Sequence, residues 1–348
     1  MSGMAYRPPY TVSDKAVALV GDISAAIERF KIAMEGPDGV RLRKINRIKT
    51  IRGTTAIEGN TLTEEQITAV LAGRCVIAPA REIAEVKGAH SAYELLGEID
   101  PCSLEDILRV HKAMMQGLVE GAGALRTRGV GVVDGLGNVI HMAPPAGRVP
   151  ELVADLLGWA RTSEAHPLIK SCVFHYEFEF IHPFLDGNGR MGRFLQTAML
   201  GTWNPLFHAA PIENMVYAEQ AGYYEAIGAS TDRADSGPFI DFILGRILAT
   251  IREKGTPVKA GETDGETVEK TNLKTGQKTS QKNEERILAA MKARPDVTVF
   301  ELAEATGLSV AGVKWNIRKL KAAGRLRRIG PDKGGHWEVA REAVNGQA

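Results

Sequence analysis

One stretch of the sequence, residues 253–282, cannot contribute to a hydrophobic core. It is rich in Lys, Glu, Thr and Gly and has almost no large apolar side chain. Such a segment cannot bury enough apolar surface to offset the entropy of ordering its backbone, so we expect a flexible linker. The linker divides the 348 residues into a large N-terminal part and a small C-terminal unit, as the length itself favours.

Helical periodicity dominates the part before the linker, and the predicted fold is mostly α. The helical pattern that contains Leu42 runs to Glu58 and ends at Gly59, a residue typical of helix stops. Thr63 then opens a new helix, with Gln66 completing a capping box. Further helices are predicted over residues 15–34, 84–99, 104–118, 150–160 and 167–181.

A short stretch interrupts the helical pattern. Residues 129–133 and 139–142 are rich in Val and flank a Gly-rich turn, which predicts a β-hairpin. Pro144 and Pro145 end it.

Composition excludes several classes of protein. Hydrophobic residues make up 44%, charged residues 24%, and the net charge is +1, as in soluble globular proteins. The three cysteines are odd in number and widely spaced, with no CxxC, which argues against a disulfide scaffold or a zinc site. Neither a signal peptide nor an apolar run long enough to span a membrane is visible, so we expect a cytoplasmic protein without membrane contact.

The most informative segment begins where an apolar helix meets His182 and Pro183. Proline cannot continue a helix comfortably, so the chain turns there. Gly187 and Gly189 then permit unusual backbone dihedrals and close approach of a phosphate, and the helical pattern resumes by Phe194. Because a Gly-rich turn that opens a helix points free N–H groups outward, this segment predicts an anion site.

Charged side chains in the same segment complete a phosphate-transfer constellation. Arg190 and Arg193 lie three residues apart and can bind further phosphate oxygens. Asp186 offers a hard oxygen ligand for Mg²⁺, and His182 can take a proton near neutral pH. The GxxxxGK[ST] P-loop is absent. His175, seven residues before His182, has no third metal ligand in view, so it is expected to be a satisfied core histidine, as is His111.

The run from His182 to Arg193 resembles the Fic-domain signature HPFx(D/E)GNGRxxR at every fixed position. The resemblance covers roughly residues 10–250. It implies a helical N-terminal region over residues 1–100 and a Fic helical core with a β-hairpin flap over residues 101–252. The nucleotide-binding residues that it implies are Asp186, Gly187, Asn188, Gly189, Arg190, Met191, Gly192, Arg193, Tyr223, Tyr224, Val139, Ile140 and His141.

The resemblance also implies a reaction. His182 would deprotonate a Tyr, Thr or Ser hydroxyl of a target protein, and this hydroxyl would attack the α-phosphate of ATP. Asp186 would hold Mg²⁺ on the phosphates, while the amides of residues 187–189 and the Asn188 side chain would form the anion hole. Arg193 would hold the γ-phosphate, and the flap would dock the target's backbone as an added strand.

A second element, Thr54 to Gly59, resembles the family's (S/T)xxxE(G/N) inhibitory motif. The resemblance implies that Glu58 pairs with Arg193 and competes with phosphate for the same guanidinium. The simpler interpretation is a solvated residue at a helix end, where a carboxylate faces the unfavourable end of the dipole. Glu58 would alternatively activate water to remove AMP from a modified target.

The C-terminal unit, residues 283–341, resembles a winged helix-turn-helix, an α+β fold of three helices and two strands. A basic run without acids extends from Val310 to Arg328. Basic recognition helices and wings of this type contact DNA phosphates, although a protein-binding winged helix is an equal alternative. The candidate DNA contacts are Lys314, Arg318, Lys319 and Arg327.

The leading functional prediction is a protein adenylyltransferase that uses ATP and Mg²⁺ and is autoinhibited through Glu58 and Thr54. The main alternative is a DNA-binding transcription regulator in which the Fic core senses nucleotide. Other Fic chemistries, with another phosphate-containing donor or with removal of AMP, also stay open. The target is an unknown protein, which includes the chain itself, and a homodimer is suggested only by what relatives often do.

Overall fold

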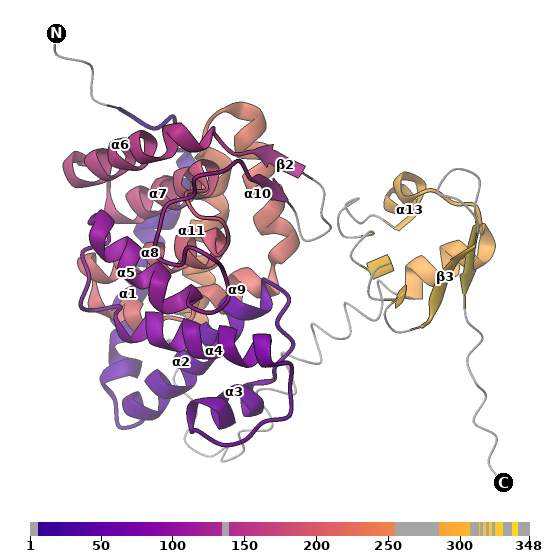
Figure 1. The fold of residues 1–348 in the computed structure, drawn as a ribbon, viewed down its shortest axis with the longest axis horizontal. Coiled ribbons are helices and arrows are strands. Elements are labelled where there is room, and N and C mark those ends of the chain that lie inside the picture. The colour runs from indigo at the N-terminus through magenta and orange to yellow at the C-terminus, as the bar shows by residue number, and fades with distance from the viewer. Residues whose placement is uncertain are drawn as a thin grey trace. The chain divides into compact units, whose positions relative to one another are not determined.

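The computed structural model describes residues 6–133, 139–254 and 285–306, and after these residues 313, 316–317, 320–321, 324–329 and 336–339. The chain forms two compact units, Met1–Pro257 and Val258–Ala348 (Figure 1). Residues 255–282 of the predicted linker lie outside the described part.

The first unit is mostly helical, as predicted. Its helices are α1 (Asp14–Glu35), α2 (Gly39–Ala56), α3 (Glu64–Leu71), α4 (Ala80–Glu94), α5 (Leu104–Met115), α6 (Val149–Thr162), α7 (Pro167–Ile181), α8 (Asn188–Trp203), α9 (Ile212–Ala218), α10 (Gln220–Arg233) and α11 (Gly237–Lys254), with short 3-10 turns η1 (Ala146–Arg148) and η2 (Pro205–Ala209). In the described part of the chain, no helix combines the length and apolarity that a membrane span needs.

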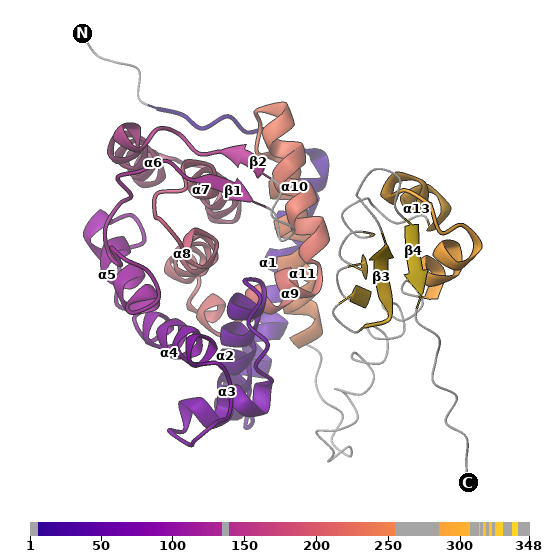
Figure 2. The ribbon, with the colours of Figure 1, turned by 45° about the vertical axis from the view of Figure 1, so that its right-hand side comes forward.

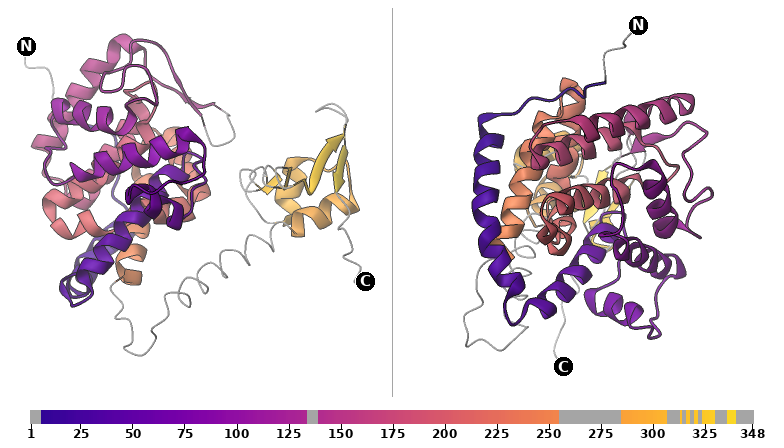
Figure 3. Two further views of the ribbon diagram at one scale, coloured as in Figure 1. Left: turned by 60° about the horizontal axis from the view of Figure 1, so that its bottom comes forward. Right: turned by 90° about the vertical axis from the view of Figure 1, so that its left-hand side faces the viewer.

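Local signals explain where several helices begin. Ser13 caps α1 by accepting a hydrogen bond from the Ala16 amide. The predicted capping box at α3 is confirmed in both directions, since Thr63 accepts from the Gln66 amide and the Gln66 side chain accepts from the Thr63 amide. α1 runs alongside α11 (Figure 3), and the two helices share the core of the unit.

α8 lies at the centre of this unit, surrounded by the other helices (Figure 2), and 13 of its 16 residues are buried. Its partner is α7, whose residues are buried on nearly all sides. Gly192 allows the close approach, because a Cβ there would lie 2.6 Å from a carboxylate oxygen of Glu179 and 2.8 Å from the His175 ring. The loop that joins these two helices is therefore anchored by the most buried part of the fold.

The predicted hairpin is present as strands β1 (Gly131–Val133) and β2 (Val139–Met142), paired antiparallel. Gly131 pairs with Met142, and the register shifts between Val132 and Val133. The first strand begins two residues later than predicted. The turn, residues 134–138, lies outside the described part.

The second unit contains a helix over residues 285–293, helix α13 (Val299–Thr306) and strands β3 (Leu326–Ile329) and β4 (His336–Val339). The strands pair antiparallel, with Leu326 opposite Val339. Ile287, Met291 and Leu302 lie in a small separate core. The two helices and two strands described here occur in the order of the predicted winged helix-turn-helix, and most of the third predicted helix lies outside the described residues.

Candidate active site

Residues 182–193 form the loop between α7 and α8 and the first turns of α8. Two residues in left-handed backbone conformation shape the loop: His182, at φ 51°, ends α7, and Gly187, at φ 82°, caps α8. A Cβ on Gly187 would lie 2.7 Å from the Met115 sulfur, so the position needs glycine for space as well as for conformation. The Gly-rich turn thus opens a helix, as the sequence predicted.

The backbone of α7 orients the imidazole of His182. The side chain is half-buried, and its Nδ1 lies 3.2 Å from the carbonyl oxygen of Glu179. Since a carbonyl can only accept, Nδ1 carries the hydrogen and Nε2 keeps its lone pair. This tautomer presents Nε2 as the nitrogen that can accept a proton.

The Asn188 side chain supports the loop and does not line the anion site. Its Oδ1 accepts from the Phe184 amide at 2.8 Å and its Nδ2 donates to the Phe184 carbonyl at 2.9 Å, in a buried position. The prediction that this side chain contributes to the anion hole is therefore corrected. The anion site is left to the backbone N–H groups at the start of α8.

His111 supports the same loop from α5. Its Nδ1 accepts from the Gly123 amide at 2.8 Å, so Nε2 donates to the Asp186 carbonyl at 3.0 Å. The ring stacks on Phe184 with centroids 3.7 Å apart. Burial lowers the pKa of His111 to about 4, so the ring is neutral near pH 7. His111 is a satisfied interior histidine, as predicted.

One carboxylate oxygen of Asp186 is bonded within the loop, and the side chain is partly exposed. Oδ1 accepts from the Gly187 amide at 2.6 Å and from Arg190 at 3.2 Å, whereas Oδ2 lies 3.6 Å from a guanidinium nitrogen of Arg81. The side chain is 41% exposed. No group of three or more His, Cys, Asp and Glu that could hold a metal occurs among the described residues. A single accessible carboxylate fits Mg²⁺, because this ion is commonly held by one or two carboxylates together with substrate phosphates and water.

Arg193 is buried and points to the end of α2. Its Nη2 lies 2.7 Å from Glu58 Oε1 and 3.2 Å from the Thr54 carbonyl oxygen, and its Nε lies 3.4 Å from the Thr54 hydroxyl. Burial is the largest influence and works against the guanidinium charge, but Glu58, Tyr223 and Glu179 together outweigh it and keep the pKa of Arg193 above its ordinary value. The sequence predicted this pairing, and the structure brings both partners together.

Glu58 also covers the first turn of α8. A Cβ on Gly189 would lie 3.0 Å from both Glu58 Oε1 and Arg193 Nη1. The Gln220 side chain holds the turn that carries Glu58, by donating to the Ile57 carbonyl at 2.9 Å. A carboxylate therefore stands where an anion would meet the start of α8. Gln220 was missed by sequence reasoning, because no local pattern links α10 to this turn.

The two predicted nucleotide-binding tyrosines occupy different environments. Tyr223 is 2% exposed, and its hydroxyl lies 3.1 Å from His175 Nε2 in the core. Tyr224 is half-buried, and burial followed by the nearby charge of Glu58 raises its pKa. Tyr224 is thus partly exposed beside Glu58, whereas Tyr223 is buried behind it and contacts the Tyr224 ring. Val139, Ile140 and His141 form strand β2.

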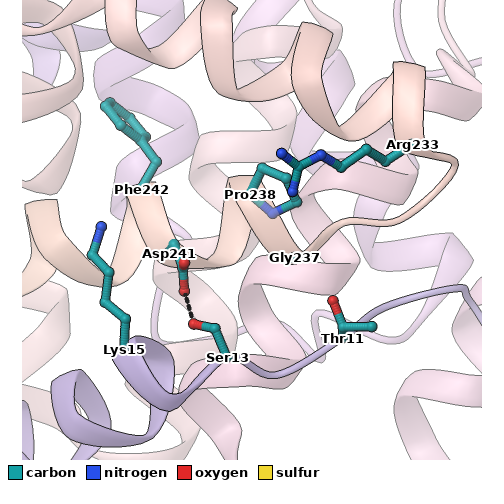
Figure 4. A pocket seen from close by; sticks show the side chains of 8 residues that line it. All are labelled: Thr11, Ser13, Lys15, Arg233, Gly237, Pro238, Asp241 and Phe242. Carbon is teal, nitrogen blue, oxygen red and sulfur yellow. Dashed lines mark hydrogen bonds between the residues drawn. The ribbon is translucent and has the colours of Figure 1, made fainter.

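One pocket of the first unit, and the predicted DNA contacts, involve residues outside this loop. A pocket near the start of α11 is lined by residues of that helix, of α10 and of the N-terminal segment, including Ser13, which donates to Asp241 at 2.6 Å (Figure 4). None of residues 182–193 lines it. In the second unit, Arg327 is exposed on β3, whereas Lys314, Arg318 and Lys319 lie outside the described residues.

Comparison with known proteins agrees with the geometry. The sequence profile of the Fic/DOC family matches residues 101–200, and a profile described as winged helix-turn-helix DNA-binding matches residues 281–327. The protein adenylyltransferase fic-1 of Caenorhabditis briggsae is 31% identical over 214 residues, 57% of this chain and 39% of that protein. The chain thus spans about two fifths of the length of the curated relatives it matches.

Solved structures extend the likeness to both units. A Fic family protein from Desulfovibrio desulfuricans G20 is 36% identical and superposes with a TM-score of 0.70, over 99% of this chain and 100% of that one. Fic-1 from C. elegans shares the fold at a TM-score of 0.55, with 23% identity over 69% of this chain and 72% of that one. With a relative of this identity matched over its whole length, the chain belongs to the Fic family.

Proposed function

We propose that this protein transfers AMP from ATP to a hydroxyl group of a target protein. The observation that carries the proposal is the position of His182, whose Nε2 is kept as an acceptor, in the same short loop as the anion site at the start of α8. A protein that only binds nucleotide has no need of a base there. Curated relatives are named protein adenylyltransferases, which supports the same reaction.

The reaction balances with the groups present. The target's hydroxyl oxygen forms a bond to the α-phosphorus of ATP while the bond from that phosphorus to the bridging oxygen breaks and pyrophosphate leaves. The hydroxyl proton passes to Nε2 of His182. We propose a Tyr, Thr or Ser as the modified residue, since each of these side chains has a hydroxyl oxygen that can attack the α-phosphorus.

Catalysis would rest mainly on positioning and on charge. The free amides of the first turn of α8 would receive phosphate oxygens, and Arg190 and Arg193 would hold further ones. Asp186 would hold Mg²⁺, which when bound offsets the negative charge of the phosphates. The hairpin would align the target by adding its backbone as a strand.

The structure described here is a resting form under this proposal. Arg193 is already bound to Glu58, and the Glu58 carboxylate lies over the helix turn that a phosphate would approach. ATP therefore has to displace Glu58 before Arg193 can hold the γ-phosphate. Thr54 assists the inhibitory contact, because its hydroxyl accepts from Nε of Arg193 and its carbonyl oxygen accepts from Nη2, the nitrogen that also contacts Glu58.

The test is incorporation of label from α-³²P-ATP into protein with Mg²⁺, comparing wild type, Glu58→Gly, and Glu58→Gly combined with His182→Ala. Transfer that rises strongly in Glu58→Gly and disappears in the double variant supports the proposal. A Glu58→Gly protein that binds ATP but labels neither itself nor any lysate protein would refute it. Incubating labelled product with wild type shows whether AMP is also removed, and γ-³²P-ATP shows whether a phosphate is transferred instead.

A second candidate function is DNA binding through the C-terminal unit. It is favoured by the family match over residues 281–327 and by the exposed Arg327 on β3. Duplex DNA of mixed sequence is the probe, with affinity measured against salt concentration. Loss of one phosphate contact in Arg327→Ala is expected to reduce the salt slope by about 1. Affinity that does not respond to salt would rule out phosphate contacts of this kind.

A further inference from the structure

A single buried arginine, Arg126, holds the end of α7. Its Nε donates to the His182 carbonyl at 2.7 Å and its Nη2 to the Ile181 carbonyl at 3.3 Å. Its own backbone amide donates to the Pro183 carbonyl at 2.9 Å. Three successive carbonyl oxygens around His182 are thus fixed by one residue, and this residue is only 3% exposed.

The same guanidinium also joins the two ends of the hairpin. Nη1 donates to the Arg128 carbonyl at 3.1 Å, before β1, and Nη2 donates to the Pro144 carbonyl at 2.6 Å, after β2. The planar guanidinium has its donors in a fixed geometry, so acceptors that bind it are held at fixed distances from one another. Arg126 therefore links the strands to the loop that presents the base.

The backbone at His182 requires such support. At φ 51° a side chain with a Cβ lies close to the following carbonyl oxygen, which costs about 1–2 kcal/mol in the left-handed region. Strained residues of this kind persist where their surroundings fix them. The hydrogen bonds from Arg126 to the carbonyls of residues 181–183 supply that constraint directly at the strained position.

We propose that Arg126 is a positioning residue for the transfer reaction, because it fixes the imidazole of His182 relative to the hairpin. It acts through His182, since its bonds go to residues 181–183 and to the hairpin ends. Docking of a target strand and presentation of the base are then parts of one rigid arrangement. The expected effect of Arg126 on the transfer rate rests on the proposed function. The expected effect of Arg126 on the position of His182 does not.

The activity test uses the full chain with Glu58→Gly as background. Arg126→Gln and Arg126→Lys are compared with Arg128→Gln, a matched control that removes an exposed cation from the same segment and leaves its carbonyl in place. At saturating ATP, Arg126→Gln is expected to slow labelling by about 10- to 100-fold, as a misplaced base would, and Arg126→Lys by less. ATP affinity is expected to change less than about twofold, because the proposed phosphate contacts of residues 186–193 stay in place.

Two outcomes overturn the inference in this assay. Labelling by Arg126→Gln at the rate of the Arg128→Gln control shows that the guanidinium does not position the base. A parallel loss of rate, ATP affinity and thermal transition shows a merely structural role. If the glutamine variant fails to fold, the lysine variant carries the comparison.

A second measurement decides the inference even where no protein is labelled. The ring ¹H–¹³C signals of His182, assigned with a His182→Ala variant, are expected to shift in Arg126→Lys, while those of His166 at the far end of α7 stay unchanged. Unchanged His182 signals overturn the inference. Absence of labelling by the Glu58→Gly background, together with shifted His182 signals, instead counts against the proposed function and leaves Arg126 as the residue that positions His182.

Discussion

Replacing Glu58 by Gln should raise the affinity for ATP and leave the affinity for ADP nearly unchanged. The variant keeps the size of the side chain and removes its charge. Arg193 is 2% exposed and lies 2.7 Å from Oε1 of Glu58, which is 31% exposed. Only ATP has the γ-phosphate that we assign to Arg193, so only ATP gains when this guanidinium is released.

The magnitude follows from the contact. A hydrogen bond to a charged group contributes about 1.5–3 kcal/mol, and the partial exposure of Glu58 favours the lower end. Because Gln still accepts a neutral hydrogen bond, the net change is about 1–2 kcal/mol, a factor of about 5 to 30 in affinity. The gain in ATP affinity for Glu58→Gly should be at least as large, because this variant removes the whole side chain.

Calorimetric titration of each variant with Mg²⁺-ATP and Mg²⁺-ADP measures the ratio of the affinities for ATP and ADP. Glu94→Gln is the matched control, because it breaks an ion pair with Arg47 and leaves Arg193 untouched. The reasoning is refuted if Glu58→Gln and Glu94→Gln have the same ratio of ATP to ADP affinity. It is equally refuted if both nucleotides gain alike, since that would mean that Glu58 blocks the site without competing for the γ-phosphate.

Three further predictions concern the supports of the site. Asn188→Ala leaves the buried amide and carbonyl of Phe184 without partners and should destabilise the fold by about 2–4 kcal/mol. Scanning calorimetry should show a lower transition temperature, and an unchanged transition would contradict the support of the loop by Asn188. Gly53→Ala places a Cβ 2.5 Å from the Asn214 amide nitrogen and should lower the free energy of unfolding by about 1–3 kcal/mol. Gly21→Ala is the control and should stabilise α1, because nothing lies within 4 Å of its Cβ. Equal effects of the two variants in calorimetry would show that α2 is not tightly packed on α9. Finally, the pKa of His111 is lowered from 6.5 to about 4, so the folded state disfavours its proton and stability falls as pH drops from about 6.5 to 4. Urea unfolding should show a loss of about 2 kcal/mol between about pH 7 and pH 5 that His111→Gln lacks, and an identical loss in that variant would reject the assignment.

Much of the architecture was predictable because its signals are local. Proline at one end and a His-Pro break at the other predicted α7 over residues 167–181 without error. The capping box at Thr63 was confirmed in both hydrogen bonds. Helix boundaries were predicted wrongly where the sequence has no such signal. The helix predicted over residues 84–99 begins at Ala80 and ends at Glu94. Helix α5 ends at Met115, three residues earlier than predicted, and Gly117 after it has a φ of 79°.

The candidate site was predictable where residue type alone decides the role. The predicted pairing of Arg193 with Glu58 is present in the structure, whereas the catalytic roles of His182 and Asp186 stay predictions. The roles of Asn188 and Arg126 were not visible, because their partners are backbone carbonyl and amide groups. Every residue has such groups, so no sequence pattern marks which of them a distant side chain will meet.

Under the proposed autoinhibition, the position of Glu58 and Arg193 in one chain affects regulation. Glu58 is attached to the same compact unit as Arg193, so its local concentration is fixed and diluting the protein cannot relieve the contact. A soluble ligand that competes for Arg193 meets a contact of the same strength at every protein concentration, so the uninhibited fraction of the enzyme would depend on the concentration of nucleotide.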